Sequence, residues 1–139
     1  MTTNFRASFC DPFQRDIIEL GDIQKEKIID KFENTAWANF LGKMETAKRE
    51  EIFYSPSFGV ENKDTKHGLE ISAVGDPGKY EFYIFYKRPK TVKTFFGLKE
   101  KVNEGYMSDK TGMTKQDAID CLNALIRNDT EYLANKIGQ

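Results

Sequence analysis

His67 is the only histidine in the 139-residue chain. The residue type that most often acts as a general acid or base therefore occurs once. A catalytic triad or a histidine metal site needs partner groups, and a site with several histidine ligands is excluded. His67 is left as a lone general base or as a solvated residue at a strand entrance. Two carboxylates, Glu70 and Glu81, are expected on the more polar face of a predicted sheet, near Tyr83. Paired carboxylates can perform acid–base chemistry or hold a divalent ion. One candidate site is therefore a pocket between helices and sheet that uses Glu70, Glu81 and His67.

A run of aromatic and basic residues between positions 83 and 96 gives the second candidate site. Aromatic rings with basic neighbours on an open sheet face bind single-stranded nucleic acid, because bases stack on the rings and phosphates pair with Lys or Arg. Aromatic residues and Arg are also enriched in protein interfaces, whereas Lys is depleted there. The second interpretation makes this run a protein-binding surface. Its predicted members are Tyr83, Phe85, Lys87, Arg88, Lys90 and Lys93.

The four residues Asp109-Lys110-Thr111-Gly112 resemble the phosphorylation motif of P-type ATPases, in which the Asp accepts the phosphoryl group. Met113 departs from the Thr of that family, and the chain has no apolar run of about 20 residues with which to cross a membrane. We interpret this segment as a turn that leads to a helix capped by Thr114.

Composition narrows the classes of function. Charged residues make up 31% of the chain and the formal net charge is −1. Residues 61–99 carry 8 basic and 5 acidic side chains, a contrast too weak to favour a nucleic-acid partner. Cys10 and Cys121 lie far apart and form no C-x-x-C motif, which indicates reduced thiols in a cytoplasmic protein. No signal peptide, metal-ligand set or cofactor loop is predicted, and neither is a membrane partner.

A β-hairpin between Gly68 and Tyr86 is the clearest structural signal. The turn residues Gly75-Asp76-Pro77-Gly78 separate two strand-like segments, and a four-residue loop would place Ile71 opposite Phe82 and Leu69 opposite Ile84. Directly opposed residues share a face, so an apolar and a mixed face emerge. The apolar face collects Leu69, Ile71, Ala73, Tyr80, Phe82, Ile84 and Tyr86, and the mixed face collects Glu70, Ser72, Glu81, Tyr83, Phe85 and Lys87.

The flanking elements follow from capping and periodicity. Asp11-Pro12 predicts a helix to Leu20, and Trp37 opens an apolar stripe of helical spacing. Thr114 and Asp129 each predict a helix start in the last quarter of the chain. The remaining strands are predicted at Ile52–Tyr54, Phe58–Glu61, Thr91–Leu98 and Val102–Ser108. The expected fold is α+β in a single domain, 1–139: N-terminal helices, an antiparallel meander of about five strands, and C-terminal helices packed on one face of the sheet.

The sequence favours a small, soluble, non-enzymatic interaction protein, such as an adaptor, a regulator or an immunity-type protein, with a protein partner. The first alternative is a ligand-binding protein or enzyme with the pocket described above, and the second is a single-stranded nucleic-acid binder. A deep pocket in which a carboxylate and a Tyr converge would favour the first alternative, whereas a flat aromatic patch would favour protein binding. The identity of the partner and the oligomeric state stay open.

Overall fold

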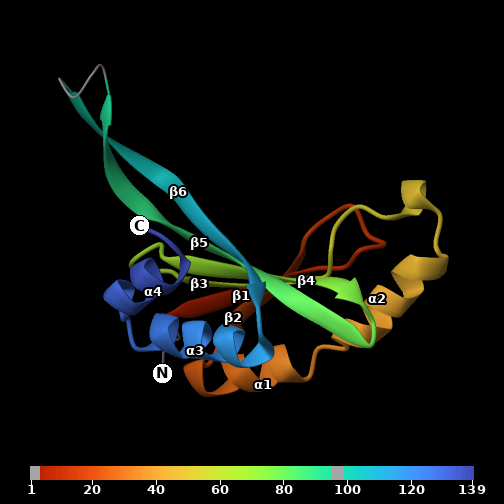
Figure 1. Cartoon of the computed structure of the whole chain (residues 1–139). Helices are drawn as coiled ribbons and strands as arrows, with labels where there is room; N and C mark the ends of the chain where they lie inside the picture. The colour runs from red at the N-terminus through yellow and green to blue at the C-terminus, as the bar shows by residue number, and fades with distance from the viewer. Residues whose placement is uncertain (1–3, 95–98) are drawn as a thin grey trace.

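The computed structural model describes residues 4–94 and 99–139, with the side chains of 92–94 and 99–100 outside the description. It is an α+β fold in which one antiparallel sheet has the strand order β2-β1-β3-β4-β5-β6 (Figure 1). The strands are β1 (Phe5–Cys10), β2 (Ile18–Ile23), β3 (Ser57–Asn62), β4 (Gly68–Asp76), β5 (Lys79–Thr94) and β6 (Lys99–Met113). The helices are α1 (Ile28–Glu33), α2 (Trp37–Thr46), α3 (Lys115–Ile126) and α4 (Thr130–Ile137), with short 3-10 turns at Lys25–Lys27 and Arg49–Glu51.

The N-terminal segment is a correction to the sequence prediction, because it forms two strands rather than a helix from Asp11 to Leu20. Phe5 and Ala7 are buried while Arg6 between them is exposed, which is the two-residue period of a strand. The Asp11 carboxylate accepts a hydrogen bond from the Phe13 N–H at 2.9 Å and so closes a local turn instead of capping a helix. The fold therefore has six strands rather than about five.

The faces of the β4–β5 hairpin are as predicted, but its register differs by two residues. Ile71 lies opposite Ile84 and Ala73 opposite Phe82, because the loop is the two-residue turn Pro77–Gly78. A shift of two residues keeps every side chain on its predicted face, since the strand period is two. The apolar face is accordingly buried, with Ile71, Ala73 and Ile84 fully covered.

Strands β5 and β6 form a long twisted ribbon that extends past the other strands (Figure 1). The predicted strand at Thr91–Leu98 is the continuation of β5 as far as Thr94, and its last residues lie outside the described part. Pro89 is accommodated by a bulge, because Arg88 pairs with Tyr106 and Lys90 with Asn103, which leaves one extra residue in β6. Asp109–Gly112 belongs to β6 and is not a separate turn, although Gly112 has a left-handed φ of 70° at a second bulge.

The helices pack on one side of the sheet (Figure 1). Trp37 and Leu41 of α2 are buried as the apolar stripe predicts, and the Trp37 indole N–H donates to the Phe32 carbonyl at 3.1 Å. Thr114 caps α3 in a reciprocal box with Asp117, and Asp129 caps α4, as predicted. The predicted strand at Ile52–Tyr54 is absent: these residues are an irregular segment before β3.

Candidate functional site

The side of the sheet that faces away from the helices carries two adjacent rows of directly opposed residues that cross all six strands. We call this side the open face. The first row has a glycine in its third place and an aromatic ring in its fifth: Glu19, Ser8, Gly59, Glu70, Phe85 and Asp109. The second row is more strongly charged: Asp22, Arg6, Glu61, Gly68, Lys87 and Met107. Neighbouring strands are about 4.8 Å apart, so consecutive members of a row are within side-chain contact.

A shallow depression of about 310 Å³ lies where the two glycines interrupt these rows. A Cβ atom placed on Gly59 would lie 2.7 Å from Ser8 Oγ and 3.2 Å from Glu70 Oε2, and one on Gly68 would lie 3.0 Å from the Val60 carbonyl oxygen. Both glycines therefore permit close approach by neighbouring groups. Charged and apolar side chains surround this glycine floor, among them Arg6, Glu19, Glu61, Glu70, Phe85, Lys87 and Met107.

Glu70 is half-buried and lines the depression. Burial raises its pKa above the ordinary value, and this effect outweighs the hydrogen bond from Cys10 and the charge of Lys87, which both lower it. Within the described part of the chain, no basic group lies within ion-pair distance of the Glu70 carboxylate. The Cys10 thiol lies 3.7 Å from Glu70 Oε1, and burial together with that carboxylate raises the pKa of Cys10 to about 11. Cys10 is therefore a protonated donor and not a nucleophile at neutral pH.

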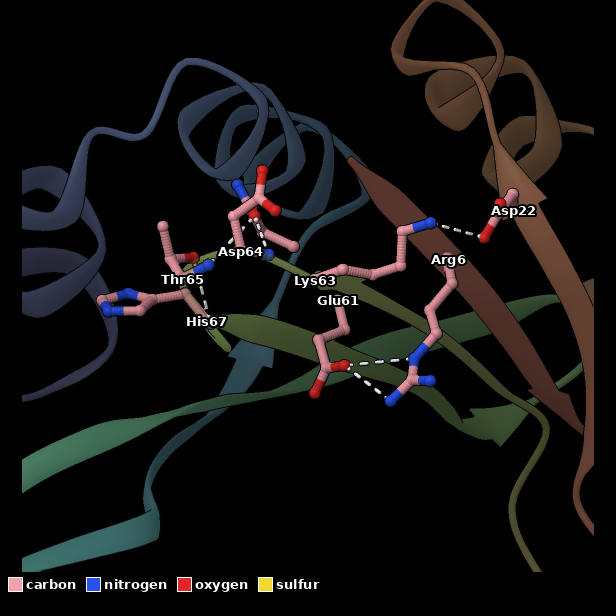
Figure 2. Close-up of polar contacts among 8 residues, drawn as sticks. Arg6, Asp22, Glu61, Lys63, Asp64, Thr65 and His67 are labelled. Atoms are coloured by element: carbon pink, nitrogen blue, oxygen red, sulfur yellow. Dashed lines mark hydrogen bonds and ion pairs between the residues drawn. The ribbon is translucent and has the colours of Figure 1, made fainter. Parts of the chain in front are cut away.

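Two ion pairs link strands near these rows, and Arg6 and Glu61 of the first pair also line the depression (Figure 2). Arg6 Nη2 lies 2.8 Å from Glu61 Oε1 on the open face, so the charge of Arg6 is matched inside the protein. Lys63 Nζ lies 2.8 Å from Asp22 Oδ1 and connects the turn after β3 to the edge strand β2. Asn62 orders this turn because its side-chain oxygen accepts hydrogen bonds from the Asp64 and Thr65 amides.

The structure brings three of the six predicted interaction residues together: Tyr83, Phe85 and Lys87 alternate along β5 on the open face, and both rings are half-buried. Arg88 points to the helix side and is only 6% exposed. Lys90 lies on that side too, with Nζ 4.6 Å from the centre of the Tyr106 ring. The Lys93 side chain lies outside the described residues.

The three residues of the predicted pocket are also separated. Glu70 is on the open face, whereas His67 points towards α4 on the helix side (Figure 2) and its Nδ1 lies 2.8 Å from the Tyr86 hydroxyl. Burial, with a smaller effect of the Arg88 charge, lowers the pKa of His67 below its ordinary value. Glu81 is exposed on the open face opposite Val74, four residues along β5 from Phe85. The depression around Glu70 has no tyrosine among its lining residues.

The structure has an exposed apolar edge that was not predicted from the sequence. Ile17 is 52% exposed and Phe53 44% exposed, and Leu20 and Tyr54 are also exposed. The segment with Phe53 and Tyr54 lies against the loop before β2, since the Phe53 N–H donates to the Pro12 carbonyl and the Tyr54 hydroxyl to the Arg15 carbonyl.

A groove of about 230 Å³, lined by Phe9, Ile18, Leu20 and Phe40 among others, lies beneath β2. The helix predicted from Asp11 to Leu20 covered the positions of Ile17 and Leu20, so their exposure was not expected.

Other kinds of site receive no support from the part of the chain that the structure describes. Across residues 4–94 and 99–139, no group of three or more His, Cys, Asp or Glu side chains is placed to hold a metal ion. None of the described helices is both long and apolar enough to cross a membrane.

Comparison of the chain with protein-family models, with curated proteins and with solved structures finds no match in any of the three. The function is therefore inferred from the geometry of the open face.

Proposed function

We propose that this chain is a non-enzymatic interaction protein, an adaptor, regulator or immunity-type protein, that binds a protein partner through the open face of its sheet. One observation carries the proposal: Tyr83, Phe85 and the 55% exposed Met107 lie on a sheet face that none of the described helices covers. Covering such apolar surface contributes about 25 cal/mol per Å², and half-exposed aromatic rings are frequent anchors of protein interfaces.

The distribution of ionisable groups supports binding over catalysis. His67 and Glu70 lie on opposite sides of the sheet, and the Cys10 thiol that donates a hydrogen bond to Glu70 is protonated at neutral pH. A mechanism that combines a separate general acid and general base needs both groups within reach of one substrate, which His67 and Glu70 are not. The shallow, charged depression without a converging tyrosine also differs from the deep apolar pocket of a typical enzyme.

The nucleic-acid alternative would use the same face, with Tyr83 or Phe85 as stacking rings. Of the predicted basic residues whose side chains the structure describes, only Lys87 stands beside them, and Glu19, Glu61, Glu70, Glu81 and Asp109 occupy the same side of the sheet. We expect no micromolar binding of a generic single-stranded oligonucleotide at physiological salt, because these carboxylates repel phosphates. Micromolar binding with a log–log salt slope near −3, the value for about four neutralised phosphates, would favour this alternative.

The test is an affinity capture from the source organism with three forms of the tagged protein. The first is the wild type, the second carries Tyr83→Ala and Phe85→Ala, and the third carries Glu50→Ala in an exposed position of the Arg49–Glu51 turn. We expect a defined protein to be captured by the wild type and the Glu50 variant and lost with the double variant. Titration of that purified protein should show a loss of at least about tenfold in affinity. Equal capture by all three forms, or no specific capture by any, would refute the proposal.

A further inference from the structure

We propose that the depression at Glu70 receives an arginine side chain of the partner, whose guanidinium pairs with the Glu70 carboxylate and stacks on the Phe85 ring. This inference rests on the proposed function, because it names the group by which the partner is recognised.

The two groups that a guanidinium needs are direct neighbours on the open face. Glu70 of β4 lies directly opposite Phe85 of β5, and both line the depression. A carboxylate accepts two parallel hydrogen bonds from a guanidinium, and the same flat cation stacks on an aromatic face. Lysine satisfies the first interaction as a point charge but lacks the planar group for the second. The pair therefore favours arginine over lysine.

The charges around the depression favour a positively charged ligand over a negatively charged one. Glu19, Glu61 and Glu70 line it against Arg6 and Lys87, which leaves an excess of one negative charge when Glu70 is ionised. Arg6 is already paired with Glu61 at 2.8 Å. Lys87 is exposed, and its charge acts on Glu70 without an ion pair between the two. An anionic ligand would find only Lys87 free among these lining cations, with three carboxylates against it.

Gly59 and Gly68, the two glycines at the floor of the depression, leave space for the guanidinium. Glu70 Oε2 lies over Gly59, where a Cβ atom would stand 3.2 Å from it, and Gly68 leaves the neighbouring position of the second row without a side chain. Gly59 has no left-handed φ, so alanine is compatible with its backbone. Its only close contacts would be the ends of the Ser8 and Glu70 side chains, which can shift. Gly59→Ala therefore displaces the ends of the Ser8 and Glu70 side chains at the floor of the depression without changing its charge.

The burial of the Glu70 carboxylate also supports a role in binding. Its raised pKa shows that the ionised form is disfavoured in the free protein, so this carboxylate is held at a position where it weakens the fold at neutral pH. A cation of the partner would form an ion pair with the Glu70 carboxylate, which has none in the described part of the free protein. Carboxylates of this kind are typical of functional sites, where stability is given up for binding.

The experiment titrates the protein with N-acetyl-L-arginine N-methylamide and follows the backbone amide resonances of Gly59 and Gly68 by NMR. We expect saturable binding with a dissociation constant on the order of millimolar, the affinity of a single side-chain-sized fragment. The citrulline analogue, which has the same shape without the charge, is the matched probe and should bind at least about tenfold more weakly.

Four variants localise the effect. Glu70→Gln, an isosteric change, and Gly59→Ala should each weaken probe binding about tenfold, and Glu81→Gln on the same face should leave it unchanged. Lys87→Gln should strengthen it severalfold, because a like charge is removed. Unshifted amide resonances outside the open face show that each variant is folded.

The outcomes separate this inference from the proposed function. Arginine and citrulline probes that bind equally, or binding that survives Glu70→Gln, would refute the arginine site while leaving partner capture intact. Free L-arginine that binds much more tightly than the blocked probe would also refute it, since a free amino acid would then be the ligand. A partner captured through Tyr83 and Phe85 that has no arginine in its contact surface would refute the inference alone.

Discussion

Cys10 and Glu70 contact one another across a strand to which neither belongs: the thiol sulfur of β1 lies 3.7 Å from the carboxylate oxygen of β4, with β3 between them. The contact is possible because Gly59 of β3, directly opposite Glu70, has no side chain. The missing side chain at Gly59 thus allows contact between Cys10 and Glu70, the two groups of the open face with raised pKa values. The first two predictions follow from this contact.

Glu70→Gln should stabilise the free protein at neutral pH. Folding raises the pKa of Glu70 above the ordinary 4.5, so the folded state keeps a proton that the unfolded chain has released. Stability therefore falls as the pH rises through the window above 4.5, and the loss persists at higher pH. We expect a higher Tm for the variant than for the wild type at pH 7, because the variant has no buried charge at this position. The difference should vanish near pH 4, and a variant that is less stable at pH 7 would contradict the assignment.

Cys10 should react slowly with iodoacetamide and faster in Glu70→Gln. The pKa of Cys10 is raised to about 11, first by burial and then by the Glu70 charge and hydrogen bond, so removing the charge increases the thiolate fraction. We expect a severalfold faster alkylation at pH 8, measured by mass spectrometry of the Cys10 peptide. Cys121 is the internal control: its pKa is raised to about 12 chiefly by burial, and its rate should not change. Equal acceleration at both cysteines would indicate a general loosening of the fold.

Arg88 should be important for stability and not for binding. Its guanidinium donates to the Tyr86 carbonyl, Ser108 Oγ and the Gly138 carbonyl, each at 3.0 Å, and lies between the Tyr86 and Tyr106 rings. We expect Arg88→Ala to lower the free energy of unfolding by about 2–4 kcal/mol, because one buried and two partly buried acceptors lose a charged donor. Lys90→Ala, two residues further on, should cost less than about 1 kcal/mol. Denaturant unfolding measures both, and a loss of partner binding without a loss of stability in Arg88→Ala would restore Arg88 to the interaction surface.

Acidification should destabilise the protein through His67. Folding lowers the pKa of His67 below the ordinary 6.5, so the unfolded chain binds a proton more readily and stability falls as the pH drops through 6.5 and below. His67→Asn should remove this part of the pH dependence between pH 7 and 5. Thermal unfolding at three pH values, with Glu81→Gln as the control variant, checks it. An unchanged pH profile in His67→Asn would show that His67 does not titrate with folding.

The faces of the sheet were predictable wherever a strand alternates cleanly. Glu70, Tyr83, Phe85 and Lys87 were assigned to the correct side, because a register error of two residues preserves the side. The same alternation placed Arg88 with Tyr86 on the buried side, but the sequence interpretation grouped Arg88 by its charge instead. Two-residue spacing is therefore a better guide to the surface than the clustering of charges along the chain.

The contacts between distant strands were not predictable. Cys10 meets Glu70 only because β3 lies between β1 and β4, and that order requires β1 to pair with a strand about 50 residues later. The turn at Asp11-Pro12 resembles a helix start, since Asp and Pro favour both, and the helix predicted there replaced β2 and the exposed residues Ile17 and Leu20. Local signals cannot distinguish such alternatives, because tertiary pairing decides between them.

Photo-crosslinking from single positions in the source organism tests the central claim, that the open face binds the partner. Benzoylphenylalanine is placed at Tyr83 or Phe85 on the open face, at Tyr132 of α4 on the helix side, and at Tyr54 on the apolar edge. Tyr83, Phe85 and Tyr132 are half-buried rings, so they are matched in size and exposure. We expect one discrete crosslinked protein from Tyr83 and from Phe85 and none from Tyr132. Crosslinks from Tyr132 or Tyr54 with none from Tyr83 and Phe85 would contradict the claim and move the binding surface to another part of the molecule.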